Sequence, residues 1–225
     1  MKRKTYTNRP YKTTYKRRKY GTRTQVPKPL RQAIKKTMNR QLETKKHYEA
    51  QMTLSPMNGN TVYTSNLLCN ITQGATENQR VGDRINLSRV HVSGEFSCKP
   101  TDNVFWHLYI FRTSNYSDQG TTVPGTIPYG NFFKNVTGNP NVDMPDPDQV
   151  RILKYKRIQC DVSNNQGTVI RRFYLSVNMK NVAYQYLTDG ASGGRNYNLY
   201  FALVTRSNEN NSIGQTESII HYKDA

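Results

Sequence analysis

Apolar and polar side chains alternate along residues 84–98, RINLSRVHVSGEFSC. The apolar residues occupy odd positions up to Leu87 and even positions from Val90 onward. Alternation with a period of two is typical of a β-strand that buries one face. A shift of one residue moves the side chains to the other face, so we expect a β-bulge near Ser88 and Arg89. The stretch therefore predicts one long strand with a bulge.

Further stretches with β character follow residue 46. They cover residues 47–54, 62–71, 104–111, 150–160, 168–179, 197–205 and 217–222. The one around the only tryptophan, Trp106, is apolar on both faces and predicts a central strand. Eight strands with unequal connections favour an all-β fold, a single eight-stranded antiparallel jelly roll of two packed sheets, because an up-and-down barrel needs short, even hairpins. The longest connection, residues 113–149, is expected to carry function or form an interface.

The N-terminal fifth of the chain carries almost all the excess charge. Residues 1–46 contain 17 Lys or Arg and one acid, Glu43, so they contribute +16 of the net +18. Residues 1–27 lack hydrophobic periodicity, and we expect a basic arm that is disordered until it binds. Residues 28–46 predict a basic amphipathic helix, with Pro29 in its first turn and an apolar residue at every fourth position. Residues 47–225 form the predicted jelly-roll domain.

A cationic arm of this kind binds phosphates without reading sequence, through the release of counterions. Four tyrosines, at positions 6, 11, 15 and 20, interleave with the cations, and stacking on unpaired bases favours a single-stranded partner. We predict nucleic-acid contacts at Lys2, Arg3, Lys4, Arg9, Lys12, Lys16, Arg17, Arg18, Lys19, Arg23, Lys28, Arg31, Lys35, Lys36 and Arg40.

Two clusters in the arm also have the layout of a bipartite nuclear import signal. They are Lys2-Arg3-Lys4 and Lys16-Arg17-Arg18-Lys19. Two basic clusters separated by a spacer suit an acidic groove on a host import receptor. The pattern therefore predicts passage through the host cell nucleus.

No catalytic motif stands out, and we expect neither an enzyme nor a cofactor. The chain lacks a phosphate-binding P-loop, a zinc-protease HExxH motif and a serine-hydrolase GxSxG motif. Cys69, Cys98 and Cys160 are too widely spaced for a zinc site and are expected to be buried or half-buried thiols. The four histidines are predicted to be isolated. No apolar run is long enough for a membrane span, so we expect no membrane insertion.

The acidic stretch DMPDPD, residues 143–148, has two interpretations. Three carboxylates this close suit a calcium ion at an interface. Alternating prolines favour a rigid polar turn instead, and we prefer the turn, with no metal site predicted.

Residues 71–95 contain a Gln-Gly turn followed by R-x-G-D-R-I and the long alternating strand. This segment resembles the capsid proteins of small circular single-stranded DNA viruses (circovirus-like, CRESS-DNA) and the coat protein of satellite tobacco necrosis virus. The matching residues are Gln73, Gly74, Arg80, Gly82, Asp83, Arg84 and Ile85. The two glycines suit turns with positive φ. We prefer a structural role for Arg80 and Arg84 over contact with nucleic acid.

The resemblance implies a virion protein that self-assembles into an icosahedral T=1 shell of about 60 copies around a single-stranded viral genome, with DNA favoured over RNA. The alternative is a basic-tailed nucleic-acid-binding protein that forms no shell. An enzyme tethered by the arm is the third possibility, and it lacks a convincing cluster of acids, histidines or metal ligands.

Overall fold

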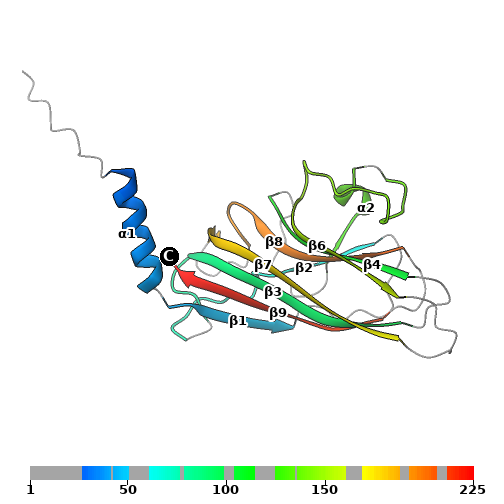
Figure 1. Ribbon diagram of the computed structural model, residues 1–225, viewed down its shortest axis with the longest axis horizontal. Helices are drawn as coiled ribbons and strands as arrows, with labels where there is room; N and C mark the ends of the chain where they lie inside the picture. Colours follow the sequence, from blue (N-terminus) through cyan, green and yellow to red (C-terminus); the bar gives the residue numbers. More distant parts are fainter. Residues whose placement is uncertain are drawn as a thin grey trace, which may run out of the picture. The chain divides into compact units, whose positions relative to one another are not determined.

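The computed structural model describes residues 27–41, 43–50, 61–76, 79–98, 104–114, 125–134, 136–160, 169–187, 193–206 and 212–225. The chain divides into two units, Met1–Gln41 and Leu42–Ala225. The helices are α1 (Lys28–Gln41) and α2 (Tyr129–Phe132) (Figure 1). The strands are β1 (Lys45–Ala50), β2 (Val62–Asn66), β3 (Arg84–Cys98), β4 (Val104–Thr113), β5 (Gly125–Ile127), β6 (Arg151–Cys160), β7 (Val169–Gln185), β8 (Asn198–Thr205) and β9 (Ser212–Asp224).

The first unit contributes one described element, the predicted basic helix. Its start agrees with the prediction. Pro29 lies in the first turn, where backbone N–H groups have no partner within the helix, so the missing N–H of proline costs no hydrogen bond. The helix ends at Gln41, five residues before the predicted end at residue 46. Leu30 and Ile34 lie one turn apart and are 51% and 47% exposed, so the apolar stripe of α1 is partly open to solvent.

The predicted helix is too long because Lys45 and Lys46 belong to β1. Lys45 pairs with Tyr222 of β9, and its ammonium lies 2.8 Å from a carboxylate oxygen of Asp224. The same ammonium donates a hydrogen bond to the backbone carbonyl of Gln79 at 2.8 Å. The jelly-roll domain therefore begins before the predicted boundary at residue 47.

The second unit folds into two antiparallel sheets with strand orders β1-β9-β3-β7 and β5-β2-β8-β4-β6 (Figure 1). When the short β5 is set aside, β1 pairs with β9 and β2 pairs with β8, which are the outermost and next strands in chain order. Further inward, β3 pairs with β7 and β4 pairs with β6. This nested pairing across two sheets is a jelly roll, and the predicted fold class is confirmed.

Most predicted strands occur at the expected places, but several differ in extent. The second ends at Asn66 and is followed by a turn, not by strand to residue 71. β7 continues beyond the predicted end, through Lys180 and Asn181 at φ of 51° and 58°, and pairs its last residues with the start of β3. β5 is additional. Part of the first predicted strand, residues 51–54, lies outside the described residues.

The bulge predicted in β3 is present. The register of β3 against both β7 and β9 shifts between Leu87 and Arg89. Because of this shift, Leu87 at an odd position and Val90 at an even position are both fully buried. A strand with uninterrupted alternation would turn one of these two groups of apolar side chains to solvent.

Aromatic side chains join the two sheets across the main core. Trp106 of β4 is fully buried and stacks on Phe96 of β3 with ring centroids 4.8 Å apart. Phe96 in turn stacks on Phe173 of β7 at 4.9 Å. Offset-stacked rings at this spacing add to the stabilisation from burial alone.

The long predicted connection folds over the other face of the β5-β2-β8-β4-β6 sheet. Residues 125–150 supply β5, α2 and a hydrogen-bonded turn, whereas residues 115–124 lie outside the described residues. Phe132 and Phe133 of this segment are fully buried, and Phe132 meets Tyr109 and Phe111 of β4 edge-on, both at 5.2 Å. We call this second core the outer cluster: Val62, Tyr109, Phe111, Ile127, Phe132, Phe133, Val150, Tyr200, Ala202 and Val204. It explains why β4 is apolar on both faces.

The acidic stretch 143–148 forms the predicted polar turn. Asp143 is 6% exposed and accepts hydrogen bonds from the backbone N–H and hydroxyl of Thr137, from the N–H of Asn139 and from the hydroxyl of Tyr129. Asp146 accepts a bond from the backbone N–H of Asp148 at 3.0 Å. The oxygens of Asp143 therefore serve protein donors, as a structural turn requires.

The R-x-G-D-R turn is held by a buried arginine. Arg80 is 1% exposed, donates to the carbonyls of Ile71 and Gly82, and places its guanidinium 3.9 Å from the ring centroid of Tyr186. This confirms the structural role preferred for Arg80. Gly82 has φ of +82°, as predicted.

The prediction of positive φ at the other glycine of the motif, Gly74, is wrong. In the described part of the chain only Gly82 and Gly138 among the glycines have positive φ. A Cβ at Gly74 would instead overlap the side chain of Gln79. The overlap involves only the flexible end of the Gln79 side chain, which can move, so this position does not require glycine.

Candidate nucleic-acid interface

The predicted contact residues fall into two groups. Those of the arm, from Lys2 to Arg23, lie outside the described residues and stay predictions, as do both clusters of the import signal. The others belong to α1, where Lys28, Arg31 and Lys36 are exposed. Lys35 and Arg40 are also part of this helix. The helix thus presents cations to solvent, as binding to phosphates requires.

The body carries a second set of cations, on the edge strand β6. Arg151, Lys154 and Lys156 are all exposed and pair with Arg112, Ile110 and Leu108 of β4. Directly paired residues point to the same side of a sheet. Ile110 and Leu108 belong to the main core, so the three β6 cations lie on the side that faces the other sheet, at its open edge. We call Arg151, Lys154 and Lys156 the basic row.

A bulge creates this row. The register between β4 and β6 shifts between Ile110 and Phe111, which leaves Leu153 as an extra residue on β6. Without it, Lys154 would point to the opposite side from Arg151. Tyr155, 46% exposed, and Arg157 lie on that opposite side, and the guanidinium of Arg157 is 5.1 Å from the ring centroid of Phe105.

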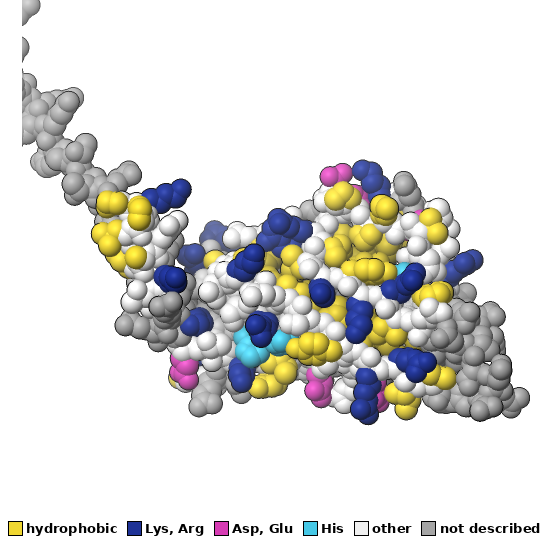
Figure 2. All heavy atoms as spheres, in the orientation of Figure 1, with side chains coloured by type: hydrophobic (Ala, Val, Ile, Leu, Met, Phe, Trp, Pro, Cys, Tyr) yellow, Lys and Arg dark blue, Asp and Glu magenta, His cyan; other side chains and the backbone are white. Residues whose placement is uncertain are grey.

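The solvent face of the β1-β9-β3-β7 sheet holds a third group. Figure 2 shows Lys and Arg side chains spread over this face, with Asp and Glu side chains near its margin. His91 and His221 meet edge-on with ring centroids 5.3 Å apart, and Tyr174, 56% exposed, hydrogen-bonds Nδ1 of His91. The prediction that the histidines are isolated is therefore wrong, because the pairing of β3 with β9 brings these two together.

Burial and neighbouring cations lower the pKa values of both histidines on this face. Burial is the main cause that lowers the pKa of His91, and His221 and Arg89 add to the effect. Burial also lowers the pKa of His221, helped by Lys46 and Arg89. A cationic neighbourhood of this kind attracts anions, and it disfavours further positive charge on the imidazoles.

Some cations of the body are used in ion pairs. Lys45 pairs with Asp224, Arg172 with Glu95 at 3.6 Å, and the exposed Lys134 with Asp148 at 3.9 Å. Within the described ranges, the cations of the basic row have no carboxylate within ion-pair distance. The row therefore remains available for an external anion.

Other kinds of site find little support in the described residues. In them, no three His, Cys, Asp or Glu side chains gather as a metal site would require. Cys69 is a buried thiol, as predicted. None of the described helices combines the length and apolarity needed to cross a membrane.

Comparisons with known proteins carry no argument about this chain. No protein-family model matches the chain, and no curated protein does. A solved structure from Desmodium yellow mottle tymovirus aligns with a TM-score of 0.39 and 9% identity over 81% of this chain and 88% of the other. The unassembled KI polyomavirus VP1 pentamer aligns with a TM-score of 0.12 and 11% identity over 80% of this chain and 72% of the other. Similarities this low carry no functional argument, and the jelly roll is assigned from the strand pairing itself.

Proposed function

We propose that this chain is the coat protein of a small virus, of the circular single-stranded DNA (CRESS-DNA) kind. In this role the jelly-roll unit assembles with copies of itself into a closed shell, and the basic N-terminal unit holds the genome. The observation that carries the proposal is the separation of charge between the two units. Met1–Gln41 has 15 Lys or Arg and no acid, whereas Leu42–Ala225 has 18 Lys or Arg and 15 Asp or Glu.

The size of the charge supports packaging. A shell of about 60 copies, each with an N-terminal unit of about +15, would supply about 900 positive charges. At one charge per phosphate this neutralises a large share of a genome of about one to two thousand nucleotides. A binder that acts as a single copy has no need for so much charge on a segment separate from its fold.

Electron microscopy of the purified full-length chain tests the coat role. We expect closed particles of uniform size when the chain is mixed with single-stranded DNA. Sensitivity of the extracted nucleic acid to DNase or RNase identifies the cargo, and we expect DNA. If no particles form in any assembly condition, the coat role is refuted and the basic-tailed binder that forms no shell replaces it.

A variant with a neutral arm tests the role of the N-terminal unit. The ten Lys and Arg of residues 1–27 are changed to Gln, and a chain lacking residues 1–27 serves as a second variant. We expect folded bodies that retain much less nucleic acid than the unchanged chain, measured by the ratio of absorbance from nucleic acid to that from protein. Particles that package as well as the unchanged chain would show that the arm does not hold the genome.

The nuclear import signal is part of the same proposal. Residues 1–27 fused to a fluorescent protein are expected to concentrate it in the nucleus. Changing either Lys2-Arg3-Lys4 or Lys16-Arg17-Arg18-Lys19 to Gln should reduce this accumulation, because a bipartite signal needs both clusters. Equal accumulation without the clusters would remove the import receptor from the list of partners.

A further inference from the structure

Two arginines face each other directly at one end of the jelly roll. Arg112, near the end of β4, pairs with Arg151, the first residue of β6. Like charges directly opposite each other in neighbouring strands are destabilising. Arg112 is half-buried and Arg151 exposed, so the repulsion between them is only partly screened by water.

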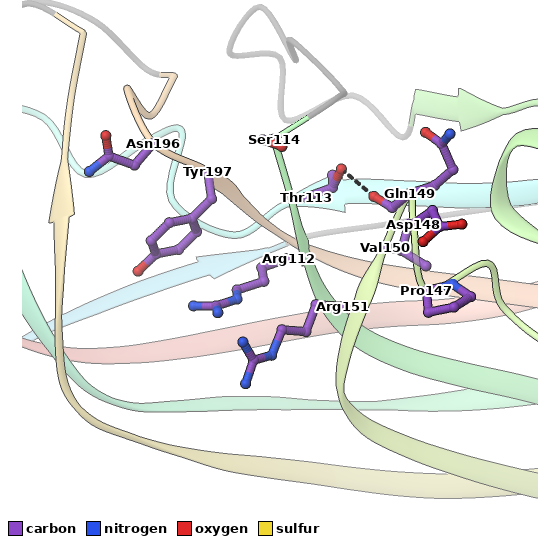
Figure 3. Close-up of a pocket in the computed structure, with 10 residues that line it drawn as sticks. All are labelled: Arg112, Thr113, Ser114, Pro147, Asp148, Gln149, Val150, Arg151, Asn196 and Tyr197. Atoms are coloured by element: carbon purple, nitrogen blue, oxygen red, sulfur yellow. Dashed lines mark hydrogen bonds between the residues drawn. The ribbon is translucent and has the colours of Figure 1, made fainter.

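The arginine pair, Arg112 and Arg151, lines a cavity of about 330 Å³. Figure 3 shows both side chains pointing the same way, toward the ring of Tyr197. The guanidinium of Arg112 lies 5.5 Å from the centroid of that ring. The hydroxyl of Tyr197 donates to the carbonyl of Ala183 at 3.3 Å, which fixes the ring in place. The cavity is thus lined by the fixed ring of Tyr197 and by two positively charged side chains, those of Arg112 and Arg151.

No carboxylate within the described ranges neutralises this pair. Among the described residues that line the cavity, Asp148 is the one acid, and Figure 3 shows it directed away from both arginines. It forms an exposed ion pair with Lys134 instead. Two arginines set opposite each other, with no carboxylate of the described residues in ion-pair distance, make a site for an external anion.

We propose that Arg112 and Arg151 bind a phosphate group, and that this phosphate belongs to a single strand of nucleic acid. Guanidinium groups bind phosphate oxygens in a bidentate manner, so two of them can share one phosphate and relieve their own repulsion. Lys154 and Lys156 continue the basic row from Arg151 along the same side of β6. They can contact the next phosphates of the nucleic-acid strand as it leaves the cavity. The source of the phosphate rests on the proposed function, whereas the site itself does not.

The test measures how salt weakens the binding of a labelled oligo-dT to the full-length chain. Each phosphate contact with a single strand contributes about 0.7 to the slope of log affinity against log salt. We expect the double variant Arg112→Gln/Arg151→Gln to lower the slope by about 0.7, because its two arginines share one phosphate, and Arg151→Gln alone to lower it by part of that amount. The control is Arg206→Gln, which removes one exposed charge just beyond the opposite end of β8 and should leave the slope unchanged.

A second measurement uses inorganic phosphate as the probe. The melting temperature of the full-length chain is compared in phosphate and in chloride at equal ionic strength. Phosphate should raise it more in the unchanged chain and in Arg206→Gln than in Arg151→Gln. Because Arg151 is exposed, its replacement is expected to leave the fold intact. The result therefore does not depend on replacing Arg112, which packs on Tyr197.

The outcomes separate the possible sources of the anion. If the arginine variants lower the salt slope of oligo-dT binding and also lose the stabilisation by phosphate, the anion is a phosphate of the bound nucleic acid. If they lose the stabilisation by phosphate but keep the salt slope, the site exists but binds free phosphate. If the variants change neither, the proposal is overturned. Failure to form particles would refute the coat role without affecting either measurement.

Discussion

Replacing Asp143 by asparagine is expected to loosen the segment that covers the outer cluster. The carboxylate receives hydrogen bonds of 2.8–3.2 Å from Thr137, Asn139 and Tyr129, and the residue is 6% exposed. An asparagine has the same shape but turns an N–H₂ group toward part of these donors. At least one donor then loses its acceptor, and the remaining bonds lose the contribution of the charge.

The magnitude follows from these bonds. Hydrogen bonds to a charged group contribute about 1.5–3 kcal/mol each, and they are not additive within one network. We expect Asp143→Asn to lower the free energy of unfolding by about 2–3 kcal/mol. For a domain of this size the melting temperature falls by about 2–4 °C per kcal/mol, so calorimetry should show a drop of about 4–12 °C.

Asp148→Asn is the matched control. Its side chain is 80% exposed and its only described ion pair, with Lys134, is long, so the change should stay within about 0.5 kcal/mol. If Asp143→Asn is as stable as this control, the carboxylate does not hold the segment and the reasoning is refuted.

The same carboxylate predicts a dependence on pH. Burial alone would raise the pKa of Asp143, but the hydrogen bonds from Thr137, Tyr129 and Asn139 outweigh it and the pKa is lowered. A lowered carboxyl pKa contributes stability that is present above the unfolded value, about 3.9, and is lost as the pH falls through the folded value. Asp143→Asn should therefore be less sensitive to acid below about pH 4 than the unchanged chain.

Two further predictions concern the histidine pair and the buried arginine. Because the pKa values of His91 and His221 are lowered on folding, their stabilising contribution is present above about pH 6.5 and is lost below it, so the melting temperature should fall from pH 7 toward pH 5. The variant His91→Gln/His221→Gln should flatten that fall, leaving the part due to His107, whose pKa is also lowered mainly by burial; an unchanged slope would exclude the pair as its cause. Arg80→Met leaves two carbonyls without their donor and should lower the urea unfolding free energy by about 2–4 kcal/mol, whereas the exposed Arg84→Met should change it by less than about 0.5 kcal/mol; equal losses in the two variants would contradict the structural role of Arg80.

The sequence by itself determined the elements and the charge separation. A strand buries alternate side chains, so the run from residue 84 to 98 could be assigned with its bulge from the change of parity between Leu87 and Val90. The apolar stretch around Trp106 likewise predicted an interior strand. The excess of cations before residue 46 is a matter of composition, and it required no knowledge of the fold to separate an arm from a body.

Only the tertiary structure decided which of these residues meet. Lys45 lies opposite Tyr222, and His91 lies beside His221, across separations in sequence that no local pattern encodes. The bulge at Leu153 has no signal in the alternation of β6, yet it sets which cations share a side with Arg151. Alternation is a local property of one strand, whereas register depends on the partner strand. For this reason the sequence alone predicted a strand at 150–160 but not the arginine pair.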